Sequence, residues 1–417
     1  MIKIVEETAG LFRDRVFSPV VTLSAFIFQV LSEDHSCRET VLKVRSDLIA
    51  QGKPPCSPGT GGYCQARGRL PKELIYRAVR ETGSKLHQES DIEWLWKGRR
   101  VVLADGSTVS MPDTPANQKD FPQPKSQEPG IGFPIARLVI LTSLASGSVL
   151  DCALGPWRGK ETGEHALLRQ ILGSLESDDV LVADRYYCSF FLIAMLGIAG
   201  IDFVFQNHTK RKVDFRRGER LGKKDHIVKW LKPVRPEWMD KETYETMPDT
   251  LTVRETKVDG RILVSNFLDT GMVTRLDLAE LYRMRWTIEI DLKFIKQILK
   301  MDVLRGKSPE MVRKEVGVHL LAYNLIRTVM AQAATIHGIA PNTISFKGTV
   351  QAMNAFQDKF LYGAEEILAT LFDELMCSIV YHRIGDRPGR KEPRAVKRRP
   401  KPYPRLTLPR AQARIHM

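Results

Sequence analysis

Four side chains of different chemistry recur near whole helical turns between residues 281 and 300. They are Tyr282, Arg285, Glu289 and Lys296, separated by three, four and seven residues. At about 100° per residue, an α-helix would hold all four within roughly 60° of arc. The spacing therefore predicts a helix that presents one carboxylate among cations along a single edge. Taken alone, the four residues are more simply explained as exposed ion pairs, each stabilising the helix by only about 0.2–0.5 kcal/mol.

An apolar stripe beside these four residues indicates which side of the helix is buried. The stripe comprises Leu281, Met284, Ile288, Leu292, Ile295 and Leu299. Two other carboxylates compete with Glu289 for a functional role. Asp291 falls on the core-facing side and Glu280 near its edge, so we take Glu289 as the candidate.

Two aspartates occur in matching settings upstream of this helix. Asp105 follows the apolar run VVLA, and Asp184 follows the apolar run VLVA. Each is predicted to leave the carboxyl end of a buried strand, where α/β sheets place their ligand-binding groups. One such aspartate would be explained by its suitability for turns. Two of them in a basic chain, with a carboxylate on a later helix, favour a shared site.

Three carboxylates held together would repel one another unless cations neutralised them. Mg²⁺ prefers carboxylate and phosphate oxygens, and two such ions can activate a nucleophile and stabilise a leaving oxygen in phosphoryl transfer. Histidine is sparse near Asp105, Asp184 and Glu289, which argues against zinc and against a histidine base. The expected cofactor is therefore two Mg²⁺ ions, with Mn²⁺ as an alternative.

The charge of the chain is concentrated in two segments. Of the net charge of +14 over 417 residues, residues 383–417 carry +10 and residues 207–235 carry +8, which leaves the rest at −4. This distribution favours a polyanionic partner over charge runs kept only for solubility. Six cysteines without paired spacing indicate neither a zinc site nor disulfides, and a cytoplasmic location is expected. The apolar segment 17–32 is too short to span a membrane and is predicted to be a buried helix.

Hydrophobic periodicity divides the chain into helical and mixed regions. Residues 1 to about 90 are helical in pattern, and the basic helix at 69–86 could equally lie on DNA or face solvent. From 99 onward the pattern predicts a strand, a hairpin at 136–155, a helix, a strand ending at Asp184, a helix and another strand. Further strands follow the basic segment, then long helices from 276 to about 381. The fold class is therefore a mixed α/β core with a Pro- and Arg-rich extended tail.

These residues together resemble the DDE insertion-sequence transposases with the YREK signature, the IS-four family. The resemblance rests on the aspartates of ADGS and ADRYYCS and on the complete Y-x2-R-x3-E-x6-K spacing, and it covers roughly residues 20 to 405. It implies an RNase H-like catalytic core interrupted by a β-rich insertion. The implied domains are a helical DNA-binding domain at 1–92, a core at 93–208 and 273–382, an insertion at 209–272 and a basic tail at 383–417.

The resemblance also implies roles for individual residues. Asp105, Asp184 and Glu289 would be the catalytic residues and the ligands of two Mg²⁺ ions. The expected DNA contacts are Tyr282, Arg285, Lys293, Lys296, Arg185 and Trp230. Relatives that form a DNA hairpin stack a flipped base on a tryptophan of the insertion, for which Trp230 is the candidate and Trp238 the alternate.

The expected function is a DNA transposase of a bacterial insertion sequence. It would bind the terminal inverted repeats, cleave the element ends and join the 3′-hydroxyl to target DNA. Its partners would be these double-stranded DNAs and a second copy of the chain, without a membrane, at the nucleoid. The alternatives are an RNase H-like nuclease without strand transfer and a non-catalytic DNA-binding descendant of a transposase.

Overall fold

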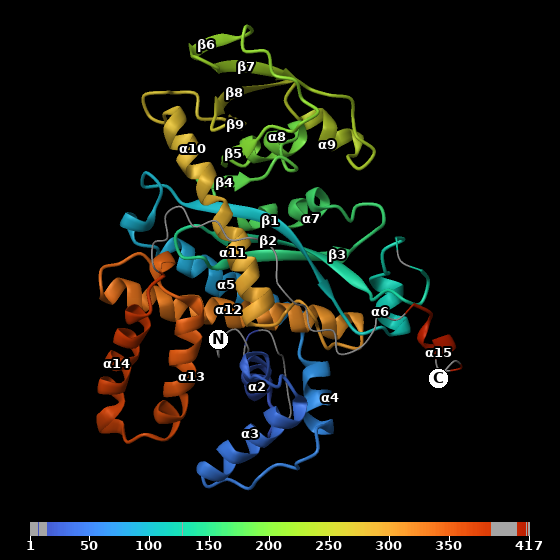
Figure 1. Cartoon of the computed structure of the whole chain (residues 1–417), viewed down its shortest axis with the longest axis vertical. Helices are drawn as coiled ribbons and strands as arrows, with labels where there is room; N and C mark the ends of the chain where they lie inside the picture. Colours follow the sequence, from blue (N-terminus) through green and yellow to red (C-terminus); the bar gives the residue numbers. More distant parts are fainter. Residues whose placement is uncertain (1–6, 8–14, 127, 385–406, 414, 416–417) are drawn as a thin grey trace.

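A nine-stranded mixed sheet forms the centre of the computed structural model, which describes residues 7, 15–126, 128–384, 407–413 and 415. The strand order is β3-β2-β1-β4-β5-β9-β8-β7-β6 (Figure 1). The strands are β1 Val101–Ser110, β2 Ile135–Ser143, β3 Val149–Pro156, β4 Val180–Ala183, β5 Asp202–Gln206, β6 Glu219–Gly222, β7 Asp225–Leu231, β8 Thr250–Val258 and β9 Arg261–Ser265. β1, β4 and β5 run parallel, and the remaining pairs are antiparallel. The predicted mixed α/β class is confirmed.

The first five strands form where apolar and polar residues alternate or where the sequence is continuously apolar. The predicted hairpin is present as β2 and β3, with Gly147 at a φ of 72° in its turn. β4 is buried at all four positions, as expected for a strand covered on both faces. Successive residues of β1 serve opposite faces, with Val102 and Ala104 in one hydrophobic cluster and Leu103 in the other.

Helices cover both faces of the sheet. One face packs against α7 (Glu164–Ile171) and α8 (Phe190–Ile198), and α9 (Lys241–Thr246) lies in the loop after β7. The other face packs against α5 (Lys72–Gln88), α10 (Arg275–Met284), α11 (Trp286–Lys293) and the 28-residue α12 (Pro309–Ile336). Figure 1 shows α10 and α11 running across the strands from the β8 side towards α12.

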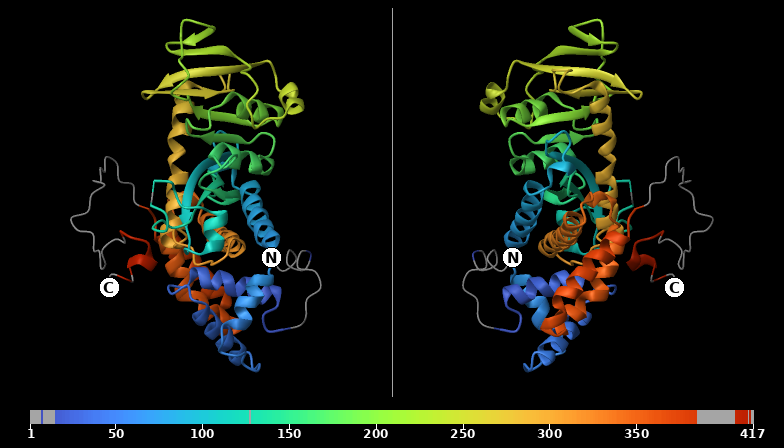
Figure 2. Two further views of the ribbon diagram at one scale, coloured as in Figure 1. Left: turned by 90° about the vertical axis from the view of Figure 1, so that its right-hand side faces the viewer. Right: turned by 90° about the vertical axis from the view of Figure 1, so that its left-hand side faces the viewer.

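The remaining helices lie beyond the sheet. They are α2 (Pro19–Leu31), α3 (Cys37–Ala50), α4 (Gly61–Arg69), α6 (Pro115–Asp120), α13 (Phe346–Tyr362), α14 (Leu368–Tyr381) and α15 (Arg410–Ala413). Single 3₁₀ turns occur at Ile92–Trp94, Leu172–Ser174, Pro341–Thr343 and Glu365–Ile367. In the side views, α13 and α14 project away from the sheet next to the N-terminal helices (Figure 2). The predicted buried helix at 17–32 is present as α2, and residues 385–406 of the predicted tail lie outside the described residues.

The strands predicted as a β-rich insertion continue the central sheet. β9 pairs with β5, so β8, β7 and β6 extend the same hydrogen-bonded ladder. Arg254 of β8 is only 1% exposed and binds both carboxylate oxygens of Asp225 at 2.9 and 2.7 Å. Its third nitrogen donates to the carbonyl oxygens of Val273 at 2.7 Å and Phe267 at 3.3 Å, just before α10. This buried ion pair ties the added strands to the helix that leads into α11.

Removing Arg254 is expected to destabilise the protein strongly, because it leaves Asp225 as a buried charge without its partner. We predict that Arg254→Ala lowers the free energy of unfolding by about 3–5 kcal/mol. Urea denaturation followed by circular dichroism measures this loss. Arg216→Ala is the control, since that side chain is 91% exposed and its pairing with Asp214 is worth little. Equal midpoints for the two variants would contradict the structural role given to Arg254.

Candidate active site

The two aspartates lie side by side on neighbouring parallel strands. β1 and β4 pair up to Ala104 opposite Ala183, and the next residues are Asp105, still within β1, and Asp184, just after the end of β4. The Asp105 Oδ1 atom accepts from the Gly106 amide at 2.8 Å, and the Asp184 Oδ1 atom accepts from the Tyr186 amide at 2.7 Å.

The prediction that both aspartates end their strands is right for Asp184 and wrong for Asp105. β4 ends at Ala183, whereas β1 continues from Asp105 to Ser110. The second half of β1 keeps its backbone hydrogen bonds because β2 remains paired with it as far as Ile135. Asp105 therefore stands in mid-strand, where β4 stops and exposes one side of β1.

Glu289 reaches the aspartates from α11. The Arg285 Nη2 atom donates to the Glu289 Oε1 atom at 2.8 Å, and its Nη1 atom lies 3.8 Å from the Asp105 Oδ2 atom. One guanidinium therefore lies between two of the three carboxylates. The pKa of Asp105 is raised to about 6, chiefly by burial and also by the nearby charges of Asp184 and Glu289, while the Gly106 amide and Arg285 oppose the shift. The three predicted carboxylates thus share one electrostatic neighbourhood.

The helix that carries Glu289 is interrupted, which differs from the single α-helix predicted. α10 ends at Met284, α11 begins at Trp286, and a π-helical turn occupies Phe294–Ile298. The predicted stripe still faces the core: Leu281, Ile288, Leu292, Ile295 and Leu299 are buried, and Met284 is half-buried. Helical turns of this wider kind are often found at functional sites.

Lys293 and Lys296, both predicted site residues, border the same cavity as Asp105 and Glu289. A cavity of about 490 Å³ is lined by Asp105, Gly106, Ser107, Glu289, Leu292, Lys293, Lys296, Gln297 and Asp302. Lys296 donates to the Ser107 hydroxyl at 3.1 Å, whereas Lys293 is exposed at the rim. Lys300, one turn further on, instead donates to the Glu33 carbonyl at 2.9 Å, in the loop between α2 and α3.

Tyr282 and Arg185 lie at opposite extremes of exposure. Tyr282 is 7% exposed, and its hydroxyl donates to the Gln206 Oε1 atom at 3.0 Å. The centre of its ring lies 5.9 Å from the Arg285 guanidinium, so the ring of Tyr282 packs against that arginine. Arg185 is exposed directly after Asp184.

The structure does not open Trp230 to a base. Trp230 is 4% exposed, its indole donates to the Glu255 Oε1 atom at 2.8 Å, and the Arg211 guanidinium lies 3.6 Å from its ring centre. Trp230 belongs to β7, and its burial there beneath Arg211 leaves no ring face free to stack on a base.

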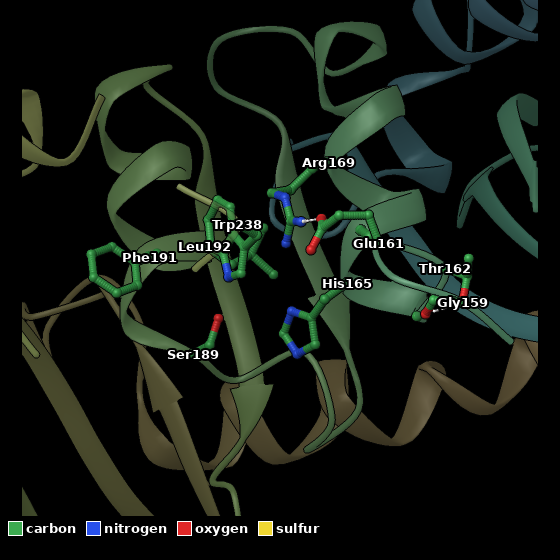
Figure 3. Close-up of a pocket in the computed structure, with 11 residues that line it drawn as sticks. Gly159, Glu161, Thr162, His165, Arg169, Ser189, Phe191, Leu192 and Trp238 are labelled. Atoms are coloured by element: carbon green, nitrogen blue, oxygen red, sulfur yellow. Dashed lines mark hydrogen bonds and ion pairs between the residues drawn. The ribbon is translucent and has the colours of Figure 1, made fainter. Parts of the chain in front are cut away.

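The alternate, Trp238, lines a pocket. It borders a cavity of about 320 Å³ together with Phe191, His165 and Arg169. Figure 3 shows the guanidinium of Arg169 over the indole, and their separation is 3.7 Å. Glu161 holds the other side of Arg169 in an ion pair. A base could stack on Trp238 only after Arg169 moved away.

The donor set suits a hard cation, but its present arrangement does not form a cage. Carboxylates are the ligands that Mg²⁺ and Mn²⁺ prefer. Among the described residues, no three His, Cys, Asp or Glu side chains are grouped so as to hold an ion. Arg285 would have to leave Asp105 and Glu289 for both to face one cation.

The part of the chain that carries these residues matches a known protein family. Residues 96–325, which include all three carboxylates, match the family model of the transposase DDE domain. The chain belongs to the DDE transposases. The expected resemblance to the IS-four family is confirmed, and the protein is a DNA transposase, an enzyme that cleaves DNA. DDE transposases generally use divalent metal ions.

Two relatives from Escherichia coli agree with this assignment. The chain is 27% identical over 367 residues to the transposase InsG for insertion sequence element IS4 of Escherichia coli K12, covering 86% of this chain and 81% of the relative. It is 34% identical over 71 residues to the transposase for insertion sequence element IS421 of Escherichia coli, which covers 17% of this chain and 19% of the relative. A solved piggyBac transposase synaptic complex with hairpin DNA aligns with 94% of this chain and 82% of its own at 10% identity and a TM-score of 0.44. Within the described residues of this transposase, no helix has the length and apolar character to cross a membrane.

The raised pKa of Asp105 predicts a pH-dependent cost to stability. The folded state binds its proton up to about pH 6, whereas an unfolded aspartate releases it near 4, so stability falls as pH rises between these values. We therefore compare the free energy of unfolding of Asp105→Asn with that of the unchanged protein. The difference should shift in favour of the variant by about 1–3 kcal/mol between pH 4 and pH 7. Urea denaturation at both pH values in the presence of a chelator measures this. A difference between the two proteins that did not change with pH would contradict the shifted pKa.

Proposed function

We propose that this transposase cleaves the ends of its insertion sequence and joins the freed 3′-hydroxyl to target DNA, using Asp105, Asp184 and Glu289 as its catalytic carboxylates. The observation that carries the proposal is that Arg285 lies between Asp105 of β1 and Glu289 of α11, while Asp184 follows the end of β4, the strand paired with β1. Both reactions are in-line displacements at phosphorus, which need positioned charges and no covalent intermediate with the protein.

The strand arrangement supports an RNase H-like core. β3, β2, β1, β4 and β5 lie in that order, with β2 antiparallel to β1 and with β4 and β5 parallel to it. We retain the division into a helical domain at 1–92, a core at 93–208 and 273–382, an insertion at 209–272 and a tail at 383–417. The pairing of β5 with β9 supports an insertion that extends the core sheet.

Two Mg²⁺ ions, or Mn²⁺ in their place, would be held by the three carboxylates. Such ions, when bound, activate the attacking oxygen and stabilise the leaving oxygen. Basic side chains of the protein would hold the DNA in place for this chemistry. Lys293, Lys296 and Arg185 would bind phosphates beside the cleaved bond, and Arg285 would exchange its carboxylate partners for a phosphate.

The DNA would extend beyond the cavity along basic surface. In the segment 207–235, Arg216 and Arg217 have side chains that are 91% and 84% exposed, next to β6 and β7. These residues suit a duplex backbone, which is bound through its charge rather than its sequence. We propose that the partners are the terminal inverted repeats and the target DNA, with two copies of the chain bringing both ends together at the nucleoid.

Substitution of each carboxylate tests the assignment. Asp105→Asn, Asp184→Asn and Glu289→Gln are each expected to reduce Mg²⁺-dependent cleavage of DNA carrying the element ends by more than about 100-fold, since even the outer partners of metal ligands cost 10–100-fold. Binding of that DNA should persist. Full cleavage by any one of the three variants would remove that residue from the site.

The products of the unchanged protein separate the alternatives. Joining of the cleaved ends to a target plasmid supports the transposase mechanism. Cleavage without joining would point to a nuclease, and binding without cleavage would point to a non-catalytic descendant.

The proposed phosphate contacts predict a change in salt dependence. Lys293→Gln should weaken DNA binding equally for all sequences and reduce the slope of log affinity against log salt by about 1. Lys300→Gln is the matched control, because that ammonium is turned to the Glu33 carbonyl. Fluorescence anisotropy across a salt series measures both slopes. An unchanged slope for Lys293→Gln would exclude it from the DNA interface.

A further inference from the structure

A fourth carboxylate, Glu164, packs directly behind the two aspartates. It is the first residue of α7, on the sheet face opposite α11 (Figure 1). A Cβ atom on Gly106 would lie 2.4 Å from the Glu164 Cδ atom and 2.6 Å from its Oε1 atom. The carboxylate of Glu164 therefore rests on the backbone of the residue that follows Asp105.

Gly106 is required here for space rather than for its backbone conformation. It lies within β1, and its φ is not among the positive values found at the turn glycines. A glycine inside a strand often marks the close approach of another group. Here that group is the carboxylate of Glu164. Gly106, in the sequence ADGS, leaves the space that Glu164, in the sequence GEHA, occupies.

Glu164 also contacts the turn that carries Asp184. The Tyr187 hydroxyl donates to the Glu164 Oε2 atom at 3.4 Å, and Tyr187 is fully buried three residues after Asp184. One side chain thus touches both chain segments on which the aspartates stand. Glu164 is not among the residues that line the cavity bordered by Asp105 and Glu289, and it lies on the other face of the sheet from α11.

A carboxylate would be an unfavourable choice at this position if its only role were to fill space. Burial raises the pKa of Glu164, and the charge of Asp184 raises it further, while Arg137 opposes both effects. The Arg137 guanidinium is itself directed elsewhere, donating to the Thr162 carbonyl at 2.9 Å and stacking on Trp157. A neutral side chain would fill the same notch without repelling Asp184.

We propose that Glu164 is a positioning residue of the acidic site: it braces the Asp184 turn against the strand of Asp105, and its charge strengthens the attraction of both aspartates for divalent cations. The inference rests on the proposed function of Asp105 and Asp184. It assigns Glu164 no contact with DNA.

Four variants distinguish the effect of the Glu164 charge from the effect of the volume that its side chain fills. Glu164→Gln keeps the shape and removes the charge, and Glu164→Ala empties the notch. Gly106→Ala forces the carboxylate out, because the new methyl group would overlap it. The double variant Glu164→Ala/Gly106→Ala refills the notch with a methyl group and restores packing without a carboxylate.

The readout is Mn²⁺ affinity of the full chain without DNA, followed by electron paramagnetic resonance, together with the melting temperature. We expect Glu164→Gln and the double variant to bind Mn²⁺ about 10-fold more weakly while melting near the unchanged protein. Glu176→Gln, which removes a charge at the opposite end of β4 where Glu176 pairs with Arg100, should bind Mn²⁺ normally.

Unchanged Mn²⁺ affinity in Glu164→Gln and in the double variant would overturn the inference and leave Glu164 a packing residue. Asp105→Ala distinguishes this result from a failure of the site itself. If Asp105→Ala abolishes Mn²⁺ binding and Glu164→Gln does not weaken it, only the role of Glu164 is wrong. If Asp105→Ala also binds Mn²⁺ normally, the proposed site is wrong, and the inference falls with it.

Discussion

Mutual repulsion among carboxylates in a half-buried hollow is the constraint on which the rest of this structure depends. Asp105, Asp184 and Glu289 are brought together from three elements, and Glu164 adds a fourth charge behind them. The Arg285 guanidinium between Asp105 and Glu289 offsets part of this repulsion. We propose that this arrangement, at a cost to the stability of the isolated protein, serves to bind divalent cations and, through them, phosphate.

Buried anchors elsewhere hold these elements against the repulsion. Asp291 of α11 is 1% exposed and forms an ion pair with Arg327 of α12, which also donates to the Tyr323 hydroxyl at 2.8 Å. Gly147 makes room for this arginine, because a Cβ there would lie 2.6 Å from its Cζ atom. With one side of α11 fixed in this way, Glu289 can only face the cavity. Arg254, which is paired with Asp225, does the same for the start of α10 by donating to the Val273 carbonyl.

Much of the candidate site could be predicted from local sequence. The apolar runs before Asp105 and Asp184 indicated buried strands, and the spacing of Tyr282, Arg285, Glu289 and Lys296 indicated a helix edge. What could not be predicted depends on partners distant in sequence. β1 continues past Asp105 because β2 pairs with it, and the register of β1 with β4 fixes how the aspartates meet.

Other features were missed for the same reason. Trp230 is buried because Glu255 and Arg211 cover it, and neither is near it in sequence. Glu164 carried only a weak signal, since an acidic residue in the first turn of a helix is already explained by the helix dipole. Its relation to Gly106 appears only when α7 packs on the sheet.

The central claim is that Asp105, Asp184 and Glu289 bind divalent cations at one place. Iron-mediated cleavage of the polypeptide tests this most directly: Fe²⁺ replaces Mg²⁺ in the full chain, and ascorbate with peroxide produces hydroxyl radicals that cut the nearest backbone. The structure predicts cuts near residues 105, 184 and 289 together, all suppressed by excess Mg²⁺. Cuts at only one of these segments, or at unrelated positions, would contradict a shared metal site.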